Sequence, residues 1–199
     1  MIGFLLTSLI LELTPGPNMG TLASLALERG RVAGLAAVGG VATGLAVVGV
    51  LAALGLAAAI SESPAIYQVL RWAGVCYLLY LAFDAWRKAG RGGIMASPAD
   101  GGSLFVHGLM LNLLNPKAAL FYIAVLPTFI DPAHGFLLAQ NLTLVAIYVA
   151  VATVVHAAVV LLAAWLRPTL LAGVGEIIAR RSLAVLMAAI AIWFAWHTR

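Results

Sequence analysis

The chain alternates long apolar runs with short polar or turn-forming breaks, and this pattern predicts membrane-spanning helices. A helix needs about 20 mostly apolar residues to cross the hydrocarbon core of a bilayer. Six runs approach or exceed that length: 2–27, 32–60, 65–86, 103–130, 136–166 and 182–197. The runs are continuous rather than alternating with a period of two, so membrane β-strands are not indicated. We therefore expect an all-α integral membrane protein with six transmembrane helices in a single domain, residues 1–199.

Composition agrees with this expectation and narrows the partners. Of the 199 residues, 64% are hydrophobic and 9% are charged, with a mean hydropathy of +1.09, whereas soluble domains are about 45–50% apolar and about 25% charged. The basic excess lies in short clusters between apolar runs and forms no continuous stripe, so we expect contact with the lipid bilayer and not with nucleic acid. Cys76 is the one cysteine, and no two histidines have helical metal-ligand spacing. No metal or cofactor is expected.

The distribution of Lys and Arg orients the six spans, because cytoplasmic loops collect these residues. No Lys or Arg precedes Arg29, so the first run lacks the basic start of a cleaved signal peptide and is expected to remain as a span. The opposite side of the predicted topology carries only Arg71 and Arg199. The N- and C-termini are therefore predicted to be periplasmic. The first, third and fifth loops hold Arg29, Arg31, Arg87, Lys88, Arg91, Arg167, Arg180 and Arg181.

Two of the runs contain residues that interrupt a helix. The first contains "LELTPGPNMG" at residues 11–20, and the fourth contains "LLNPKAALFY" at residues 113–122. Proline removes a backbone donor and clashes with the preceding turn, so we expect helix breaks at Pro15-Gly16-Pro17 and at Asn115-Pro116. Three spans in each half invert the second half relative to the first. The sequence thus predicts a 3+3 inverted repeat, about 1–95 and 103–199, as is typical of secondary transporters.

Three stretches carry a family resemblance: "LTPGPNM" in the first run, "GRVAGLAAVGGVATG" in the second and "LNLLNPKAALFYIAVLPTFI" in the fourth. Together they resemble the LysE/RhtB family of bacterial amino-acid exporters. The resemblance implies export of amino acids or related small metabolites across the bacterial inner membrane, driven by the proton motive force, by proton antiport. No phosphate-binding loop ending in Lys-Ser or Lys-Thr occurs in the chain, which agrees with transport without nucleotide hydrolysis.

The two breaks hold the candidate substrate site. Backbone amides at the start of a half-helix attract a carboxylate and carbonyls at the end of one attract an ammonium, and an amino acid carries both groups. The alternatives are that the breaks are packing kinks, that the asparagines cap helices, and that the lysine reaches the membrane interface. The predicted substrate-binding and translocation residues are Glu12, Thr14, Pro15, Gly16, Pro17, Asn18, Asn112, Asn115, Pro116, Lys117 and Tyr122.

Three residues are candidates for coupling protons to transport: Glu12, Asp84 and His156. An ionisable group at membrane depth is costly and is usually functional, and Glu12 lies one helical turn before the first break. Glu12 has an alternative role in an ion pair with Lys117, or a position near the outer interface that water reaches. Asp84 has one in a helix-end pair with the following basic residues, and His156 has one as a hydrogen-bonded packing residue.

Small residues in the second run favour close helix packing, through the pairs Gly30 with Gly34 and Gly40 with Gly44. The sequence leaves open whether these pairs pack inside one chain or at a homodimer interface. Two other functions stay as alternatives. One is export of another small solute, such as a metal cation. The other is a different class of protein, an intramembrane enzyme or a non-transporting scaffold.

Overall fold

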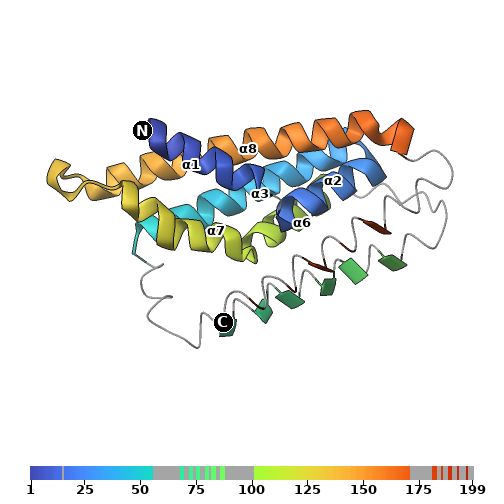
Figure 1. Ribbon diagram of the computed structural model, residues 1–199, viewed down its shortest axis with the longest axis horizontal. Helices are drawn as coiled ribbons and strands as arrows, with labels where there is room; N and C mark the ends of the chain where they lie inside the picture. The colour runs from blue at the N-terminus through green and yellow to red at the C-terminus, as the bar shows by residue number, and fades with distance from the viewer. Residues whose placement is uncertain are drawn as a thin grey trace.

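The structure is a computed structural model, and it describes residues 1–14, 16–55 and 101–170 together with scattered residues of 68–87 and 181–196. All the regular secondary structure of these described residues is helical, and no strand occurs among them. The prediction of an all-helical protein is therefore confirmed. Figure 1 shows the helices side by side along the long axis of the molecule.

The described elements follow the predicted runs in order (Figure 1). Short π and 3-10 segments continue α7 toward the loop that precedes α8. The elements are α1 (Ile2–Leu13), α2 (Pro17–Arg29), α3 (Arg31–Ala53), α6 (Gly101–Leu113), α7 (Pro116–Leu120), the π-helical turn η1 (Phe121–Val125), the 3-10 turns η2 (Leu126–Phe129) and η3 (Pro132–His134), and α8 (Leu137–Leu170).

Two described helices are long and apolar enough to cross a membrane, α3 and residues Leu137–Thr169 of α8. A third span is present if α6 and Lys117–Phe129 form one bent span. The second predicted run ends earlier than expected, since α3 stops at Ala53 before a turn at 54–55, and α8 continues four residues past the predicted end at 166. The predicted third and sixth runs are described only at scattered positions, so the six-span count and the 3+3 repeat stay predictions.

Both predicted helix breaks are present. Thr14 and Gly16 have extended backbones between α1 and α2, and Pro15 itself lies outside the described residues. Asn115 is extended between α6 and α7, and the two arms of this run are bent by 52°. Pro17 and Pro116 each begin the helix that follows the break, where a backbone N–H has no helical acceptor in any case.

Close contacts at the glycines of α3 show the directions of α6 and α8 relative to α3. A Cβ at Gly40 would overlap the carbonyl oxygen of Phe105, and one at Gly44 would lie 2.9 Å from Cβ of Asn112, so α3 and α6 are parallel. Gly34 faces Val160 and Gly49 faces Val145, so α3 and α8 are antiparallel. The glycines of α3 thus pack inside the chain. This answers, for Gly34, Gly40 and Gly44, the question that the sequence left open.

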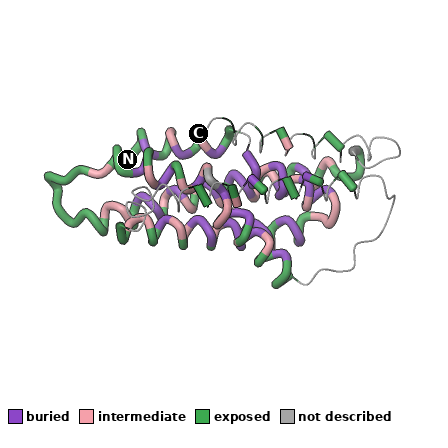
Figure 2. Tube along the Cα trace, turned by 90° about the horizontal axis from the view of Figure 1, so that it is seen from below, coloured by how far each residue is buried: buried purple, intermediate pink, exposed green. Residues whose placement is uncertain are grey.

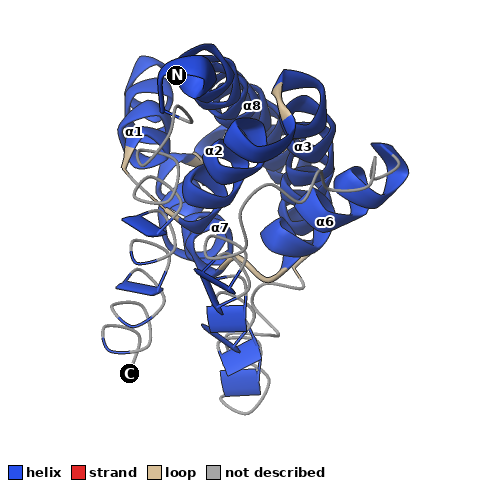
Figure 3. Ribbon diagram, turned by 90° about the vertical axis from the view of Figure 1, so that its right-hand side faces the viewer, coloured by secondary structure: helices blue, strands red, loops and turns tan. Residues whose placement is uncertain are grey.

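The first run lies parallel to α8. Glu12 contacts Tyr148, and sixteen residues later the carbonyl of Glu28 accepts a 3.2 Å hydrogen bond from Arg167. Arg167 therefore stabilises the carbonyl end of α2, next to the turn at Gly30, whose φ of 85° favours glycine. Viewed down the long axis, α2 lies among α8, α3 and α6 (Figure 3).

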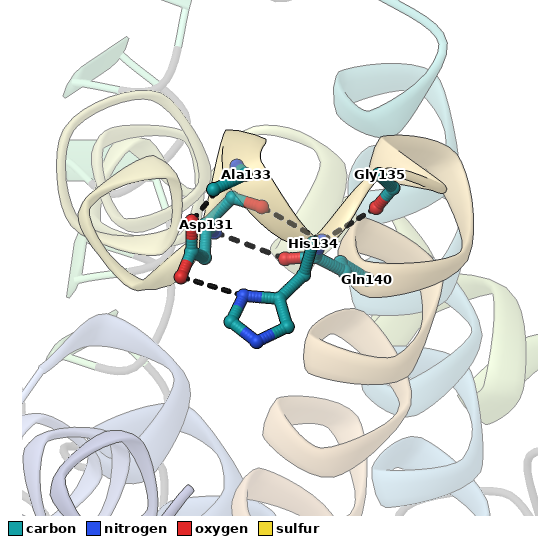
Figure 4. Close-up of polar contacts among 5 residues, drawn as sticks. All are labelled: Asp131, Ala133, His134, Gly135 and Gln140. Atoms are coloured by element: carbon teal, nitrogen blue, oxygen red, sulfur yellow. Dashed lines mark hydrogen bonds and ion pairs between the residues drawn. The ribbon is translucent and has the colours of Figure 1, made fainter.

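The loop before α8 closes the end of the bundle that also carries the N-terminus (Figure 1). The side-chain amide of Gln140 accepts from the N–H of Asp131 at 3.0 Å and donates to the carbonyls of Asp131 and Gly135 at 3.0 and 2.7 Å. The Asp131 carboxylate accepts from the N–H of Ala133 and contacts Nδ1 of His134 at 2.7 Å (Figure 4). Arg29, Arg31 and Arg167 lie at the opposite end, by the α2–α3 turn.

Figure 2 shows buried residues where the helices face one another and exposed residues on their outer sides. Many of the exposed residues have large apolar side chains. Leu6, Val154 and Trp165 are 54%, 68% and 75% exposed. Apolar exposure of this extent along whole helices suits contact with lipid chains and not with water. The core cluster between the helices includes Phe4, Leu22, Val41, Leu45, Leu111, Phe121, Tyr148 and Val160.

Candidate functional site

The two helix breaks lie against each other in the middle of the bundle. The ammonium of Lys117, the second residue of α7, donates a 3.0 Å hydrogen bond to the carbonyl of Thr14, the last residue before the first break. These two residues are 103 positions apart in the chain. Carbonyls at the end of a helix carry partial negative charge, so the lysine places its positive charge at the carbonyl end of α1.

A second hydrogen bond joins the helices on the other side of the breaks. Nδ2 of Asn18, in the first turn of α2, donates to Oδ1 of Asn112, in the last turn of α6, at 3.0 Å. Both side chains are buried, and Oδ1 of Asn18 and Nδ2 of Asn112 have no protein partner. An unpartnered buried polar atom carries a desolvation cost of about 1–3 kcal/mol. This pair therefore has one acceptor and one donor without a protein partner, and of the two residues Asn18 lines the pocket at the breaks.

Glu12 is buried against α8 rather than against the second break. Its Oε1 accepts a 2.5 Å hydrogen bond from the hydroxyl of Tyr148, and its Oε2 lies 3.3 Å from Nε2 of His156. All three side chains are buried, and Nδ1 of His156 has no protein partner. Two of the three proton-coupling candidates thus lie together, and a tyrosine holds the carboxylate in place.

One pocket connects the two groups of residues. Its empty volume is about 260 Å³, which includes space open to the outside of the protein, and Lys117 with Gly16 forms part of its wall. A Cβ at Gly16 would lie 3.4 Å from Cδ of Lys117, so the lysine stem passes directly over the break. The lining residues are Glu12, Gly16, Pro17, Asn18, Met19, Leu45, Asn115, Lys117, Ala118, Tyr148 and His156.

Several predicted site residues have structural partners. The hydroxyl of Tyr122 donates to the carbonyl of Leu45 at 2.9 Å and so fixes η1 against α3. The side chain of Asn115 accepts from the N–H of Lys117 at 3.0 Å, which is the helix-capping role that the sequence left open. The hydroxyl of Thr14 donates to the carbonyl of Ile10, in its own helix. These three hydrogen bonds shape the site, and of the three residues Asn115 also lines the pocket.

The remaining predictions have mixed outcomes. An ion pair between Glu12 and Lys117, the alternative role of Glu12, is absent: the two side chains line the same pocket, but each has other partners. Asp84 lies outside the described residues. Among the residues that the structure describes, no group of three or more His, Cys, Asp or Glu side chains is arranged to hold a metal ion.

Sequence reasoning missed Tyr148 and Ser8. Tyr148 is a polar-tipped side chain inside an apolar run, two helical turns before His156, and this spacing was the available signal. Ser8 lies one turn before Glu12 on the same face of α1, fully buried and with no protein partner for its hydroxyl. The identity of the tyrosine's acceptor, 136 residues away, depends on the fold.

Known proteins similar to this chain include transport proteins. A homoserine/homoserine lactone efflux protein of Salmonella typhimurium is 32% identical over 131 residues, which cover 65% of this chain and 64% of the relative. An uncharacterized membrane protein of Vibrio cholerae is 30% identical over 137 residues, 67% of this chain and 66% of that protein. The chain thus spans somewhat less than two thirds of the Salmonella relative. No solved structure matches the chain.

The family comparison covers nearly the whole chain. The profile of the LysE type translocators matches residues 9–198, which include both helix breaks, Glu12, Lys117 and all of α8. The match agrees with the resemblance carried by the break motifs, and with the apolar outer surface of the helices. The chain therefore belongs to the LysE type translocator family.

Proposed function

We propose that this protein is a secondary exporter of amino acids and closely related small metabolites in the bacterial inner membrane, working by proton antiport. The observation that carries the proposal is the contact of the two helix breaks, through Lys117 with Thr14 and Asn18 with Asn112. Broken helices that meet in the middle of a membrane bundle are typical of substrate sites in secondary transporters. A packing kink would need neither a lysine ammonium bound across the break nor unpartnered buried amides at that place.

The charges around the pocket are complementary to a zwitterion. Lys117 offers an ammonium to a substrate carboxylate, and the carboxylate of Glu12 together with the carbonyl of Thr14 offers acceptors to a substrate ammonium. The unpartnered acceptor on Asn18, which lines the pocket, supplies a further polar contact beside the same breaks. An ammonium has three N–H donors and Lys117 uses one of them on the Thr14 carbonyl, so it can bind a substrate carboxylate with the others.

Glu12 and His156 are the groups proposed to carry the coupling proton. They lie 3.3 Å apart at membrane depth and share the pocket with Lys117. A proton on this pair and an ammonium of the substrate both neutralise the same carboxylate, so the two ligands compete. Competition of this kind is sufficient for antiport if only the neutralised site changes its exposure from one side of the membrane to the other.

The helix directions support the inverted repeat and the orientation. The first run is parallel to α8, α3 is parallel to α6, and the two pairs are antiparallel. Exchange of the two halves by a two-fold axis would produce this relation between the first, second, fourth and fifth spans. The arginines at the α2–α3 turn favour a cytoplasmic location for that end, and hence a periplasmic location for the N-terminus and the 131–136 loop.

The experiment that tests the proposal is export from preloaded proteoliposomes with an imposed proton gradient. L-Homoserine is the first solute, because the Salmonella relative is named for it, and a mixture of the twenty common L-amino acids is the second. The wild type is expected to export at least one of them and to stop when a protonophore collapses the gradient. Lys117→Met should lower the apparent affinity about tenfold or more, because hydrogen bonds to charged groups contribute about 1.5–3 kcal/mol.

Tyr80→Phe is the matched control, because it removes a hydroxyl from a side chain that is 63% exposed and does not line the pocket. It should export at the wild-type rate. Export that continues without a proton gradient would reject antiport. An Lys117→Met variant with unchanged affinity for every exported solute would reject the site at the two breaks.

A further inference from the structure

We propose that Tyr148 is the positioning residue that links the charge of Glu12 to a gate of aromatic side chains at the end of the bundle carrying the N-terminus. This inference deepens the proposed function, on which its role in antiport rests. In it, an ionised Glu12 holds the tyrosine and the gate closed. Protonation of Glu12 removes its charge and releases both, and the ammonium of a substrate acts on the same bond by competing for the carboxylate.

The first helix buries only three side chains, and they lie along one line. Phe4, Ser8 and Glu12 follow one another at intervals of four residues, so they share one face of α1. Phe4 is nearest the N-terminal end, Glu12 is at the pocket, and the unpartnered hydroxyl of Ser8 lies between them. A path from Glu12 to that end of the molecule along α1 therefore meets Phe4.

Phe4 belongs to an aromatic cluster, which we call the gate: Phe4, Phe121, Phe129 and Tyr148. Phe129 is its outer member and is 36% exposed. The ring of Phe4 lies 5.8 Å from that of Phe121 and 5.2 Å from that of Phe129. Phe4, Phe121 and Tyr148 are each at most 1% exposed. The π-helical turn η1 and the 3-10 turn η2 supply Phe121 and Phe129. Such turns have weaker hydrogen-bond geometry than α-helix and often mark segments that move.

Tyr148 is the member of the gate that also contacts Glu12. Its ring stacks on Phe121, with centroids 3.8 Å apart and an interplanar angle of 17°, while its hydroxyl donates to Glu12 at 2.5 Å. A hydrogen bond to an ionised carboxylate is about twice as strong as one to a neutral group. Loss of the charge on Glu12 therefore weakens the bond that fixes the ring against the gate.

The other ionisable and charged groups around Glu12 come from three elements. His156 of α8 contacts Oε2, Lys117 of α7 lines the same pocket, and Tyr122 of η1 packs edge-on against Tyr148 with centroids 5.4 Å apart. The hydroxyl of Tyr122 is bound to the carbonyl of Leu45 and so is not a second donor to Glu12. Tyr148 is thus the hydroxyl that responds to Glu12 directly.

The gate can be tested without any substrate, by labelling a cysteine placed at Ser8. Ser8→Cys in a Cys76→Ala background replaces a buried hydroxyl by a thiol of similar size, on the inner side of Phe4. A membrane-impermeant thiol reagent is applied to reconstituted protein from the side on which His134→Cys reacts, because His134 is exposed in the loop at that end. Rates for Ser8→Cys are divided by those for His134→Cys over a series of pH values.

We expect the Ser8→Cys thiol to be protected at high pH and to react faster as the pH falls, because protonation of Glu12 releases Tyr148. Glu12→Gln should react rapidly at every pH. Tyr148→Phe, which keeps the ring but removes the hydroxyl, should also lose the pH dependence, with a high-pH rate raised about tenfold or more. Phe121→Leu removes the stacking partner and keeps the hydroxyl, and it should have the same effect. Tyr80→Phe should behave as the wild type.

The inference is overturned if Tyr148→Phe keeps the wild-type dependence of the Ser8→Cys labelling rate on pH. It is also overturned if Tyr148→Phe loses that dependence while Phe121→Leu keeps it. Thermal unfolding of each variant in detergent separates a changed gate from a damaged fold, since a misfolded variant loses its transition. If Tyr148→Phe misfolds, Tyr148→Leu replaces it, because leucine also has no hydrogen-bond donor for Glu12. Failure of amino-acid export with an intact gate response would reject the proposed function and leave the role of Tyr148 standing.

Discussion

Gly40→Ala is predicted to destabilise the protein although it adds a single methyl group, because α3 and α6 cross in backbone contact at this glycine. The added Cβ would lie 2.7 Å from the backbone N of Leu109 and would overlap the carbonyl oxygen of Phe105. An ordinary contact begins near 3.4 Å. The contact with Leu109 alone therefore requires α6 to move away by about 0.7 Å, and the closer carbonyl oxygen of Phe105 requires a larger movement. Neither atom belongs to a flexible side chain that can turn aside.

The size of the effect follows from two opposing terms. Overpacking of this kind costs about 1–3 kcal/mol, and replacing glycine by alanine in a helix returns up to about 1 kcal/mol. With the full gain of about 1 kcal/mol subtracted, the expected net loss is up to about 2 kcal/mol, which corresponds to a melting temperature lower by up to about 8 °C for a chain of this length. The displacement also reaches Asn112, three residues after Leu109, so export should fall together with stability.

Gly39→Ala is the matched control for the neighbouring position in the same helix. Its Cβ would lie 3.6 Å from Cδ2 of Phe105, which is an ordinary contact, so the melting temperature should stay the same or rise. The assay is thermal unfolding of both variants in one detergent, followed by size-exclusion chromatography and by homoserine export. A melting temperature for Gly40→Ala equal to or above that of Gly39→Ala would refute the account of a backbone crossing.

Two further predictions concern the site and the orientation. Asn18→Leu and Asn112→Leu should each lower the free energy of unfolding by about 1–3 kcal/mol, because each leaves a buried amide without its partner. The double variant should lose less than the sum of the two single losses. Additive losses measured by thermal unfolding would contradict the 3.0 Å hydrogen bond between the two side chains. A reporter fused at Gly92 should read as cytoplasmic and one at the C-terminus as periplasmic, and a cytoplasmic C-terminus would remove the basis of the inverted repeat.

The local features of the fold were readable from the sequence. Apolar runs and prolines act on the segment that contains them, so the helices α3 and α8 and both breaks lie where hydropathy and backbone chemistry predict. Helix ends were less accurate: α3 ends at Ala53 rather than at 60, because the apolar run continues past the turn at Gly55, where a φ of 87° favours glycine. The meeting of the breaks followed from their matching positions in the two halves.

Only the tertiary structure decided which polar groups contact one another. Sequence alone allowed Glu12 to pair with Lys117, since both lie beside a break, but the rotation of α1 turns Glu12 toward Tyr148 and His156 on α8. Lys117 then reaches the Thr14 carbonyl, 103 residues away. A periodic pattern fixes which face of a helix is buried, whereas the neighbour of that face depends on how all the helices pack. The positions of the helix breaks and the polar residues beside them could therefore be predicted from the sequence. The contacts that connect Glu12 through Tyr148 to the aromatic gate depend on the tertiary structure.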